Sequence, residues 1–254
     1  MTINSRDSNS AANDLANNDH LNGAASCVVM PDNTVICTSR IPEEKCNESL
    51  GISSAQTALG EEKELALLFL DIRNFTTFME SRSPYDVIYV IRKLFSFFNE
   101  SIEEAGGKIV ETAGDSIYAV FGLDYNIADA VKASAEAAKA IFQDLQVFNS
   151  SYAKAYYNID FEIGIGIHSG KVVVGHHDLG NLNQLTVMGL PVNIAARLQS
   201  MTKKLNNNYI ISEAAYSFLD RLGKPCEKRR IKLKGVTGYI DVRLVGTAYL
   251  SMRR

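Results

Sequence analysis

The sequence predicts an α+β domain, in which a mostly antiparallel sheet carries helices on one face. Strand-like and helix-like stretches alternate from residue 61 onward, and several of the strand-like stretches are joined by tight turns. Tight turns make neighbouring strands antiparallel, and helices between strands must bury their apolar side on a sheet. In a chain of 254 residues, a hydrophobic content of 46% is ample for a packed core.

Two regions are expected, a segment at residues 1–60 and a main domain at residues 61–250. Residues 1–24 are rich in Asn, Ser, Asp and Ala and contain almost nothing apolar. Such a composition cannot offset the entropy lost on ordering, so we expect disorder there. Residues 26–39 read as strand, turn and strand, and residues 40–60, with Pro42 and several serines, read as a linker.

The first half of the main domain is predicted to contain a strand, two helices and a hairpin. A serine followed by proline, Ser83-Pro84, is typical of a helix start, and Gly106-Gly107 is typical of a helix end. Between them, apolar residues recur at helical spacing. The predicted elements are strand 64–71, a helix opening at 74–79, the long helix from residue 83, and hairpin strands 108–113 and 116–121 around Gly114-Asp115.

The second half continues the alternation of strands and helices. An Ala-rich amphipathic stretch predicts a helix, and Pro191 is expected at the first position of a later one. We interpret Ser169-Gly170 as a turn that joins two strands. The predicted elements are helix 128–147, strands 161–168 and 171–175, strand 185–188, helix 191–205, strand 209–212, helix 213–219, and strands 230–234 and 240–245.

Charge and composition disfavour several classes of protein. Lys+Arg 26 against Asp+Glu 29 gives a formal charge of −3, without the basic excess of nucleic-acid binders, so no nucleic-acid partner is expected. The sequence shows no apolar run of the ~18–20 residues that cross a bilayer and no signal-peptide pattern, so we expect a cytoplasmic protein without a membrane partner. The four cysteines form no CxxC pair and are expected to be reduced thiols without an assigned role.

Two aspartates are the leading candidates for chemistry. Asp71 ends the apolar run 67–70, and Asp115 occupies the tip of the predicted hairpin. Two carboxylates at one sheet edge suit a pair of divalent cations about 3.5–4 Å apart, which can activate an attacking oxygen and neutralise a leaving pyrophosphate. The plainer alternatives are a helix or turn cap for Asp71 and the ordinary turn preference of Gly-Asp for Asp115.

Asn193 and Arg197 stand four residues apart on the predicted helix 191–205 and therefore on one face of it. A guanidinium donates paired hydrogen bonds to phosphate oxygens, and an amide can orient a ribose or phosphate oxygen. The pair therefore suits negative charge that grows during phosphoryl transfer. The alternative is a solvated helix face without a ligand.

Five stretches of the sequence resemble the class III nucleotide cyclases, the family of adenylyl and guanylyl cyclases. Each would be weak alone, but together they cover about residues 62–246 in the family's order. They are Leu68-Phe69-Leu70-Asp71-Ile72-Arg73-Asn74-Phe75-Thr76, Gly114-Asp115-Ser116-Ile117-Tyr118-Ala119-Val120-Phe121-Gly122, Gly164-Ile165-Gly166-Ile167-His168-Ser169-Gly170-Lys171-Val172-Val173-Val174-Gly175, Val192-Asn193-Ile194-Ala195-Ala196-Arg197-Leu198, and Leu233-Lys234-Gly235-Val236.

The resemblance implies a ferredoxin-like class III cyclase sandwich and a set of roles for the matching residues. Asp71 and Asp115, with the carbonyl of Ile72, would bind two Mg²⁺ or Mn²⁺ ions. Asn193 and Arg197 would stabilise the transition state, and Lys234 would grip the triphosphate. Phe75 and Thr76, where a helix opens, would present backbone N–H groups to phosphate.

The resemblance also implies a site shared by two chains. In this family the metal aspartates come from one chain, and the base-reading, Asn, Arg and Lys residues come from the other. A single chain that carries all of them suits a head-to-tail homodimer, and a monomer is expected to be inactive. The expected reaction converts a nucleoside triphosphate into a 3′,5′-cyclic nucleotide and pyrophosphate.

Two positions bear on which base is read. Adenylyl cyclases commonly carry Lys four residues before the second metal aspartate, whereas this chain has Glu111, as guanylyl cyclases do. A carboxylate accepts from guanine, but Thr186 at the partner position can donate or accept and decides little. ATP and GTP both stay open, as does a pyrimidine nucleotide (UTP or CTP), and a catalytically silent cyclase-like module is the alternative from another class.

Overall fold

The computed structural model describes residues 27–29, 35–37, 60–179, 182–219 and 226–250. The chain divides into two compact units, Met1–Gln56 and Thr57–Arg254. In the first unit, β1 (Cys27–Val29) pairs antiparallel with β2 (Val35–Cys37), as the strand-turn-strand pattern predicts. The expected disorder of residues 1–24 and nearly all of the expected linker lie outside the described residues.

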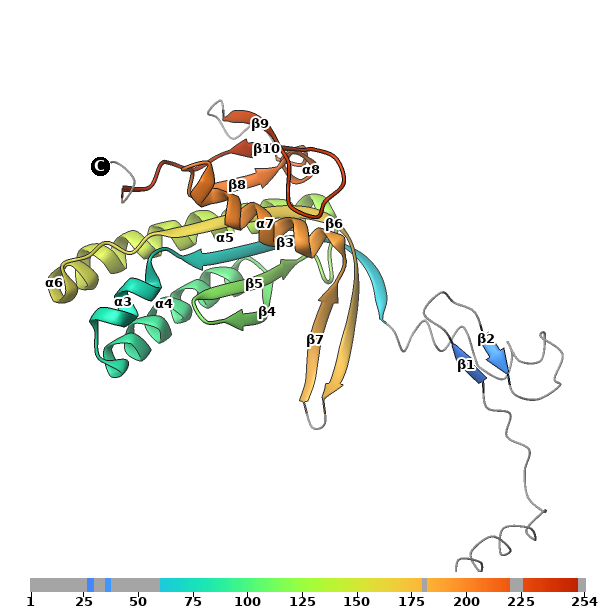
Figure 1. Cartoon of the computed structure of the whole chain (residues 1–254), viewed down its shortest axis with the longest axis horizontal. Coiled ribbons are helices and arrows are strands. Elements are labelled where there is room, and N and C mark those ends of the chain that lie inside the picture. Colours follow the sequence, from blue (N-terminus) through green and yellow to red (C-terminus); the bar gives the residue numbers. More distant parts are fainter. Residues whose placement is uncertain (1–26, 30–34, 38–59, 180–181, 220–225, 251–254) are drawn as a thin grey trace, which may run out of the picture. The chain divides into compact units, whose positions relative to one another are not determined.

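The second unit is built on an eight-stranded sheet (Figure 1). Its path runs β4-β5-β3-β6-β8-β10-β9, and β7 pairs with β6 beside this path. All of these pairs are antiparallel except β6 with β8, which confirms the mostly antiparallel sheet. The strands are β3 (Glu61–Ile72), β4 (Gly107–Ala113), β5 (Ser116–Phe121), β6 (Ile163–Leu179), β7 (Leu182–Met188), β8 (Tyr209–Ser212), β9 (Glu227–Ile231) and β10 (Ile240–Leu244).

The two long helices begin where the sequence provides side-chain caps. The Ser83 hydroxyl accepts from the Asp86 N–H at 3.2 Å, and Pro84 is the first helical residue of α4, as predicted. The side chain of Asn126 caps α5 in the same way. The helices are α3 (Phe75–Ser81), α4 (Pro84–Glu104), α5 (Ile127–Phe148), which continues through the π-helical turn η1 (Asn149–Ala153) into α6 (Lys154–Tyr157), α7 (Leu190–Lys204) and α8 (Glu213–Tyr216).

The sheet carries helices on both faces, which corrects the expectation of a single helical face. Alternate residues of β3 enter different cores: Leu68 and Leu70 pack with residues of α3, α4 and α5, whereas Leu65 and Leu67 pack with Ala195 of α7. The apolar pattern of residues 191–205 showed that this helix has a buried side but not which face of the sheet would bury it. Because side chains alternate along a strand, Asp71 projects to the same face as Leu67, the α7 face.

Several strand boundaries also differ from the prediction, since β3, β7 and β9 each begin three residues earlier than expected. β6 is a single strand of 17 residues, so the expected turn at Ser169-Gly170 is wrong. The long strand β3 pairs with β6 straight through these two residues, and this pairing supplies the ladder that the local sequence does not reveal. β9 ends at Ile231, three residues earlier than predicted, which places Lys234 in the loop before β10.

Candidate active site

The ends of β3 and of the β4–β5 hairpin bring Asp71 and Asp115 to one sheet edge. Asp71 pairs with Ser116, the first residue of β5, and the Ile72 N–H donates to the Asp115 carbonyl at 3.2 Å. Burial raises the pKa of Asp115, and the negative charge of Asp71 raises it further. The two carboxylates are therefore near enough to interact, as the sequence pattern predicts.

Polar neighbours hold the Asp71 carboxylate in place. The Ser116 hydroxyl donates to Asp71 Oδ2 at 2.8 Å, and Arg73 Nη2 lies 3.1 Å from Asp71 Oδ1. Ser116 and Arg73 are not among the residues for which the sequence predicts a role. A signal was present in both cases, because Arg73 follows Asp71 by two residues and Ser116 directly follows Asp115.

The acidic pair fits divalent cations that are shared with a phosphate ligand. The Asp71 side chain is 28% exposed, so its carboxylate remains reachable. Within the described part of the chain, no cluster of three or more His, Cys, Asp and Glu side chains forms a metal cage. Mg²⁺ is usually held by one or two carboxylates together with substrate phosphates, and that is the ligand set that Asp71 and Asp115 provide.

A second, basic group lies around α7. Arg197 and Lys234 line one pocket of about 440 Å³, together with Lys204 and Lys232. Arg197 Nη1 is buried and has no hydrogen-bond partner. A concave site with several cations and an unsatisfied guanidinium N–H suits an anionic ligand such as a polyphosphate. Neither Asp71 nor Asp115 is among the residues that line this pocket.

The loop that carries Lys234 turns at Gly235, which has a φ of +69°. A Cβ atom at this residue would lie 3.2 Å from Arg197 Nη1 and 3.3 Å from Nη2. Glycine is therefore favoured both by the backbone conformation and by the space that the guanidinium occupies. The Val236 N–H closes the turn onto the Leu233 carbonyl at 3.2 Å.

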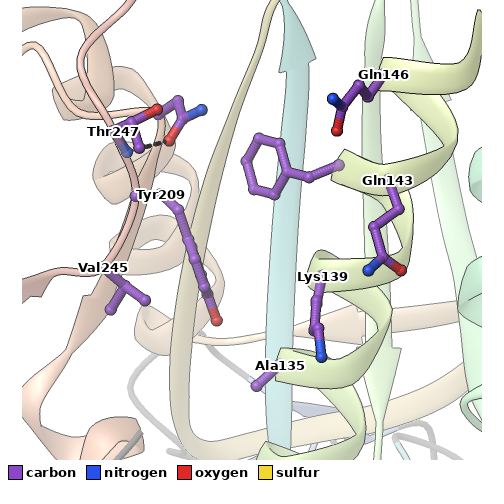
Figure 2. Close-up of a pocket in the computed structure, with 10 residues that line it drawn as sticks. Ala135, Lys139, Gln143, Gln146, Tyr209, Val245 and Thr247 are labelled. Carbon is purple, nitrogen blue, oxygen red and sulfur yellow. Dashed lines mark hydrogen bonds between the residues drawn. The ribbon is translucent and has the colours of Figure 1, made fainter. Parts of the chain in front are cut away.

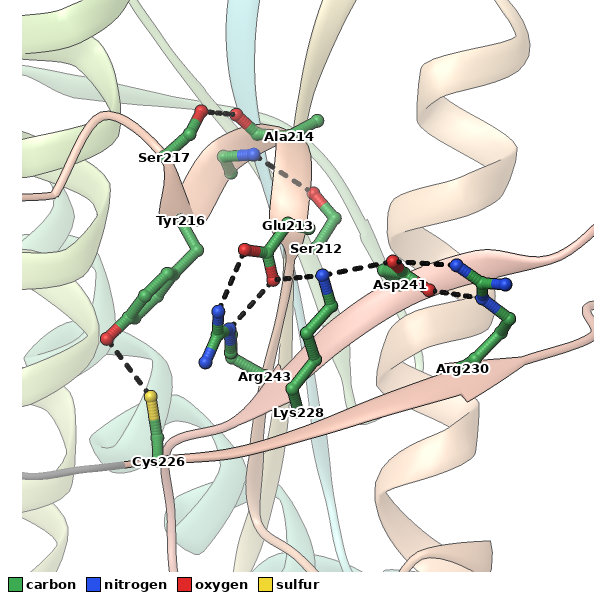
Figure 3. Close-up of polar contacts among 11 residues, drawn as sticks. Ser212, Glu213, Ala214, Tyr216, Ser217, Cys226, Lys228, Arg230, Asp241 and Arg243 are labelled. Atoms are coloured by element: carbon green, nitrogen blue, oxygen red, sulfur yellow. Dashed lines mark hydrogen bonds and ion pairs between the residues drawn. The ribbon is translucent and has the colours of Figure 1, made fainter.

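Ion pairs connect β9 and β10, the strands on either side of this loop (Figure 3). Asp241 of β10 contacts two cations of β9, Arg230 at 2.8 Å and Lys228 at 3.1 Å. Hydrogen bonds from Arg230 and then Lys228 lower the pKa of Asp241 to about 2. Arg243 of β10 binds Glu213 of α8 at 2.7 Å. The network joins β9, β10 and α8 and so fixes both ends of the Lys234 loop.

Three further candidates lie on three different elements. Asn193 is exposed on α7, one turn before Arg197, and does not line the basic pocket. Glu111 is exposed on β4 opposite Tyr118, next to a register shift. Thr186 is half-buried on β7, and its hydroxyl donates to the Gln184 carbonyl at 3.4 Å.

At the start of α3, Phe75 and Thr76 differ in exposure. Phe75 is 4% exposed and belongs to the core, so only its backbone is available to a ligand, whereas the Thr76 side chain is exposed. The side chain of Ile72 is also buried, at 1% exposed, so a metal-binding role is open to this residue only through its carbonyl.

No helix among residues 60–179, 182–219 and 226–250 has the length and apolar character needed to span a bilayer.

An acidic pair at one edge and a cationic pocket under α7 suit an α+β domain that handles metal-bound phosphate ligands. Comparison with known proteins identifies the family. The model of the adenylate and guanylate cyclase catalytic domain matches residues 58–246. The chain therefore belongs to the adenylate and guanylate cyclase catalytic domain family.

Individual relatives and structures show the extent of the similarity. Adenylate cyclase 1 of Rhizobium meliloti is 30% identical over 180 residues, 71% of this chain and 27% of that protein. The adenylate cyclase of Anabaena cylindrica is 30% identical over 167 residues, 65% of this chain and 32% of that protein. The chain thus spans about a third or less of the length of these relatives.

Solved structures share the fold. The guanylyl cyclase Cya2 superposes with a TM-score of 0.67 at 25% identity, over 76% of this chain and 97% of that one. The adenylyl cyclase CyaB from P. aeruginosa gives a TM-score of 0.67 at 22% identity, over 75% of this chain and 97% of that one. These matches confirm the expected class III cyclase fold.

Proposed function

We propose that this chain is a nucleotide cyclase, which converts a nucleoside triphosphate into a 3′,5′-cyclic nucleotide and pyrophosphate. The observation that carries the proposal is that Asp71 and Asp115 lie together at one edge of the sheet. There the negative charge of Asp71 raises the pKa of Asp115. Family membership supports it, since relatives include proteins named adenylate cyclase. In this proposal Asp71, Asp115 and the Ile72 carbonyl hold two Mg²⁺ or Mn²⁺ ions.

Each residue of the proposed site has a distinct task. When bound, the cations lower the pKa of the ribose 3′-hydroxyl and offset phosphate charge. Arg197 and Asn193 donate to phosphate oxygens as their negative charge grows, and Lys234 holds the triphosphate as a point charge. The backbone N–H groups of Phe75 and Thr76 also face the phosphates. Loss of the Arg197 donor is expected to cost about 2.7–4 kcal/mol of activation free energy, or roughly 100- to 1000-fold in rate.

We further propose that two copies of the chain share each site in a head-to-tail homodimer. Arg197 and Lys234 line a pocket to which neither aspartate contributes. This favours a site in which one chain supplies the aspartates and the other supplies the cationic residues. An apolar surface stands next to α7: Val173 of β6 is 42% exposed, its pairing partner Met188 is 61% exposed, and Leu190 is 57% exposed. Exposed apolar side chains that cluster in this way commonly mark an interface.

Mixing inactive variants tests the shared site. Asp71→Ala and Arg197→Ala chains should each retain roughly 1% of the wild-type activity or less, and an equal mixture should recover about a quarter of it. Half of the dimers would then be mixed, and each mixed dimer would hold one intact site of two. A mixture of Asp71→Ala with Asp115→Ala is the matched control and should stay inactive. No recovery in the first mixture would reject the shared site.

The substrate is proposed to be a purine nucleotide, ATP or GTP. Glu111 favours guanine by its hydrogen-bonding capacity, whereas the two curated relatives above are named as adenylate cyclases. Incubation of the purified protein with Mn²⁺ and each of the four ribonucleoside triphosphates, followed by mass analysis of the products, distinguishes the purine assignment from a pyrimidine cyclase. No cyclic product with any of the four would favour a catalytically silent module.

A further inference from the structure

A large pocket lies between α5 and the segment that follows β10, outside the proposed active site (Figure 2). Its volume is about 920 Å³, within the range of about 300–1,000 Å³ that is typical of small-molecule sites. On one side it is lined by Ala135, Lys139 and Phe142 of α5, and on the other by Tyr209, Val245 and Thr247. None of these residues has a role in the proposed cyclase reaction.

The side chain of Tyr209 gives this pocket a specific polar group. The residue is only 7% exposed, and its ring packs against Phe142 with centroids 6.3 Å apart. Its hydroxyl is buried and makes no hydrogen bond. Figure 2 shows the hydroxyl end of Tyr209 directed toward the turn of α5 that holds Ala135 and Lys139. Buried hydroxyls are nearly always hydrogen-bonded, so an unsatisfied donor in the wall of a pocket points to a missing acceptor.

Lys139 places a cation at the same end of the pocket. Its side chain lines the pocket wall beside Ala135, one helical turn away. The rest of the wall offers apolar surface from Phe142 and Val245, and amides from Gln143 and Gln146. One phenol donor and one ammonium group suit a single negative charge, in contrast to the several cations around Arg197.

We propose that this pocket binds a small amphipathic anion. A carboxylate or sulfonate group accepts hydrogen bonds from the Tyr209 hydroxyl and the Lys139 ammonium, and an apolar body lies along Phe142 and Val245. Two smaller pockets, of about 410 and 220 Å³, share Phe142 with this one and are also lined by Leu250. The proposal concerns binding alone and does not depend on cyclase activity.

A fluorescence titration of the purified full-length chain with 8-anilinonaphthalene-1-sulfonate tests this site. The probe joins an apolar aromatic body to one sulfonate, and we expect saturable binding of one molecule per chain. Ala135→Trp, which fills the pocket, should weaken binding at least tenfold. Tyr209→Phe removes only the hydroxyl and should weaken binding five- to tenfold, and Lys139→Gln several-fold.

Controls distinguish specific binding in the pocket from nonspecific adsorption of the probe. Lys132→Gln lies on the same helix outside the pocket and should bind the probe like wild type. Decanoate should displace the probe, and the neutral decan-1-ol should displace it at least tenfold less well. Circular dichroism of each variant checks its fold, and Tyr209→Phe is conservative enough to keep it. Unsaturable binding, wild-type affinity in both Tyr209→Phe and Ala135→Trp, or equal displacement by the alcohol would overturn the proposal.

Discussion

The guanidinium of Arg73 lies 3.1 Å from a carboxylate oxygen of Asp71, so a cation of the chain itself already faces the acidic pair. The Arg73 side chain is 14% exposed, and its Cζ atom lies 5.7 Å from the ring centre of Tyr249, which is 1% exposed. Tyr249 lies beyond residue 246, where the match to the family model ends. A residue outside the matched range therefore packs on the arginine that contacts Asp71.

This ion pair predicts a metal-dependent change in stability. Arg73→Met keeps most of the packed stem but leaves Asp71 and Asp115 to repel each other, so without metal it should destabilise the protein by about 1–2 kcal/mol. Mn²⁺ should then raise the melting temperature of the variant more than that of wild type, because the ion replaces the lost positive charge. Thermal unfolding with and without Mn²⁺ measures both effects.

Arg92 provides the control for this experiment, since it is exposed on α4. Arg92→Met should change the melting temperature little and should leave the response to Mn²⁺ unaltered. An equal Mn²⁺ response in Arg73→Met and wild type would show that Arg73 does not compensate the acidic pair.

Glu111 is the residue whose substitution should change the base preference. Its side chain is exposed on β4, so replacement is not expected to disturb the core. In Glu111→Lys an acceptor becomes a donor, and the kcat/KM for GTP should fall about tenfold or more if the carboxylate reads guanine. The ratio of kcat/KM values for GTP and ATP is the measurement. Glu104→Lys, an exposed charge reversal at the end of α4, is a matched control, and an unchanged ratio in Glu111→Lys would remove Glu111 from base recognition.

Gly166 of β6 should control the position of α7. A Cβ atom there would meet the backbone of that helix, at 2.8 Å from the Ala195 carbonyl oxygen and closer still to the Gln199 nitrogen. Gly166→Ala must push α7 outward, so we expect a loss of about 1–3 kcal/mol in stability. Because α7 carries Asn193 and Arg197, kcat should fall about tenfold or more, as displacements near 1 Å can do.

Gly246→Ala is the matched control for this prediction. A Cβ atom at Gly246 would lie 2.6 Å from the Tyr209 nitrogen, away from α7, so the variant should lose stability but keep its kcat. Urea unfolding and steady-state kinetics on both variants separate the two effects. If Gly166→Ala were destabilised with an unchanged kcat, the contact between β6 and α7 would not be what positions Arg197.

His168 should make stability depend on pH. It is 8% exposed, its Nδ1 lies 2.8 Å from the Ser212 hydroxyl, and burial lowers its pKa to about 4. The unfolded chain, with a histidine pKa of about 6.5, therefore binds more protons than the folded chain between these two values. The stabilising effect of neutral His168 is complete above pH 6.5 and is lost as the pH falls toward 4, by about 2 kcal/mol at pH 5.

Urea unfolding at pH 7.5 and pH 5.0 measures this effect. His168→Gln removes the titrating ring, so the variant should lose about 2 kcal/mol less than wild type over this interval, although it starts from a lower stability at pH 7.5. The comparison cancels the carboxylates that titrate in both proteins. Identical losses in the two proteins would contradict a buried, neutral His168.

Much of the architecture follows from local signals in the sequence. Ser83 with Pro84 marks the start of α4 because a hydroxyl cap and a proline without an N–H suit the first turn. Asp71 and Asp115 could be placed at one edge because each ends a short-range pattern, an apolar strand and a Gly-Asp turn. These features depend on neighbours in the chain.

Other features depend on contacts with residues that are distant in the sequence. The unbroken strand β6 exists because β3, about a hundred residues earlier, pairs along it, and Ser169-Gly170 by itself is typical of a turn. The face that buries α7, the contact of Arg73 with Tyr249, and the pocket around Tyr209 likewise arise between segments distant in sequence. The sequence alone determined the family, the acidic pair and most of the helices, since those patterns are local. Only the tertiary structure decided the surroundings of each side chain, because burial and pairing join residues that no local pattern connects.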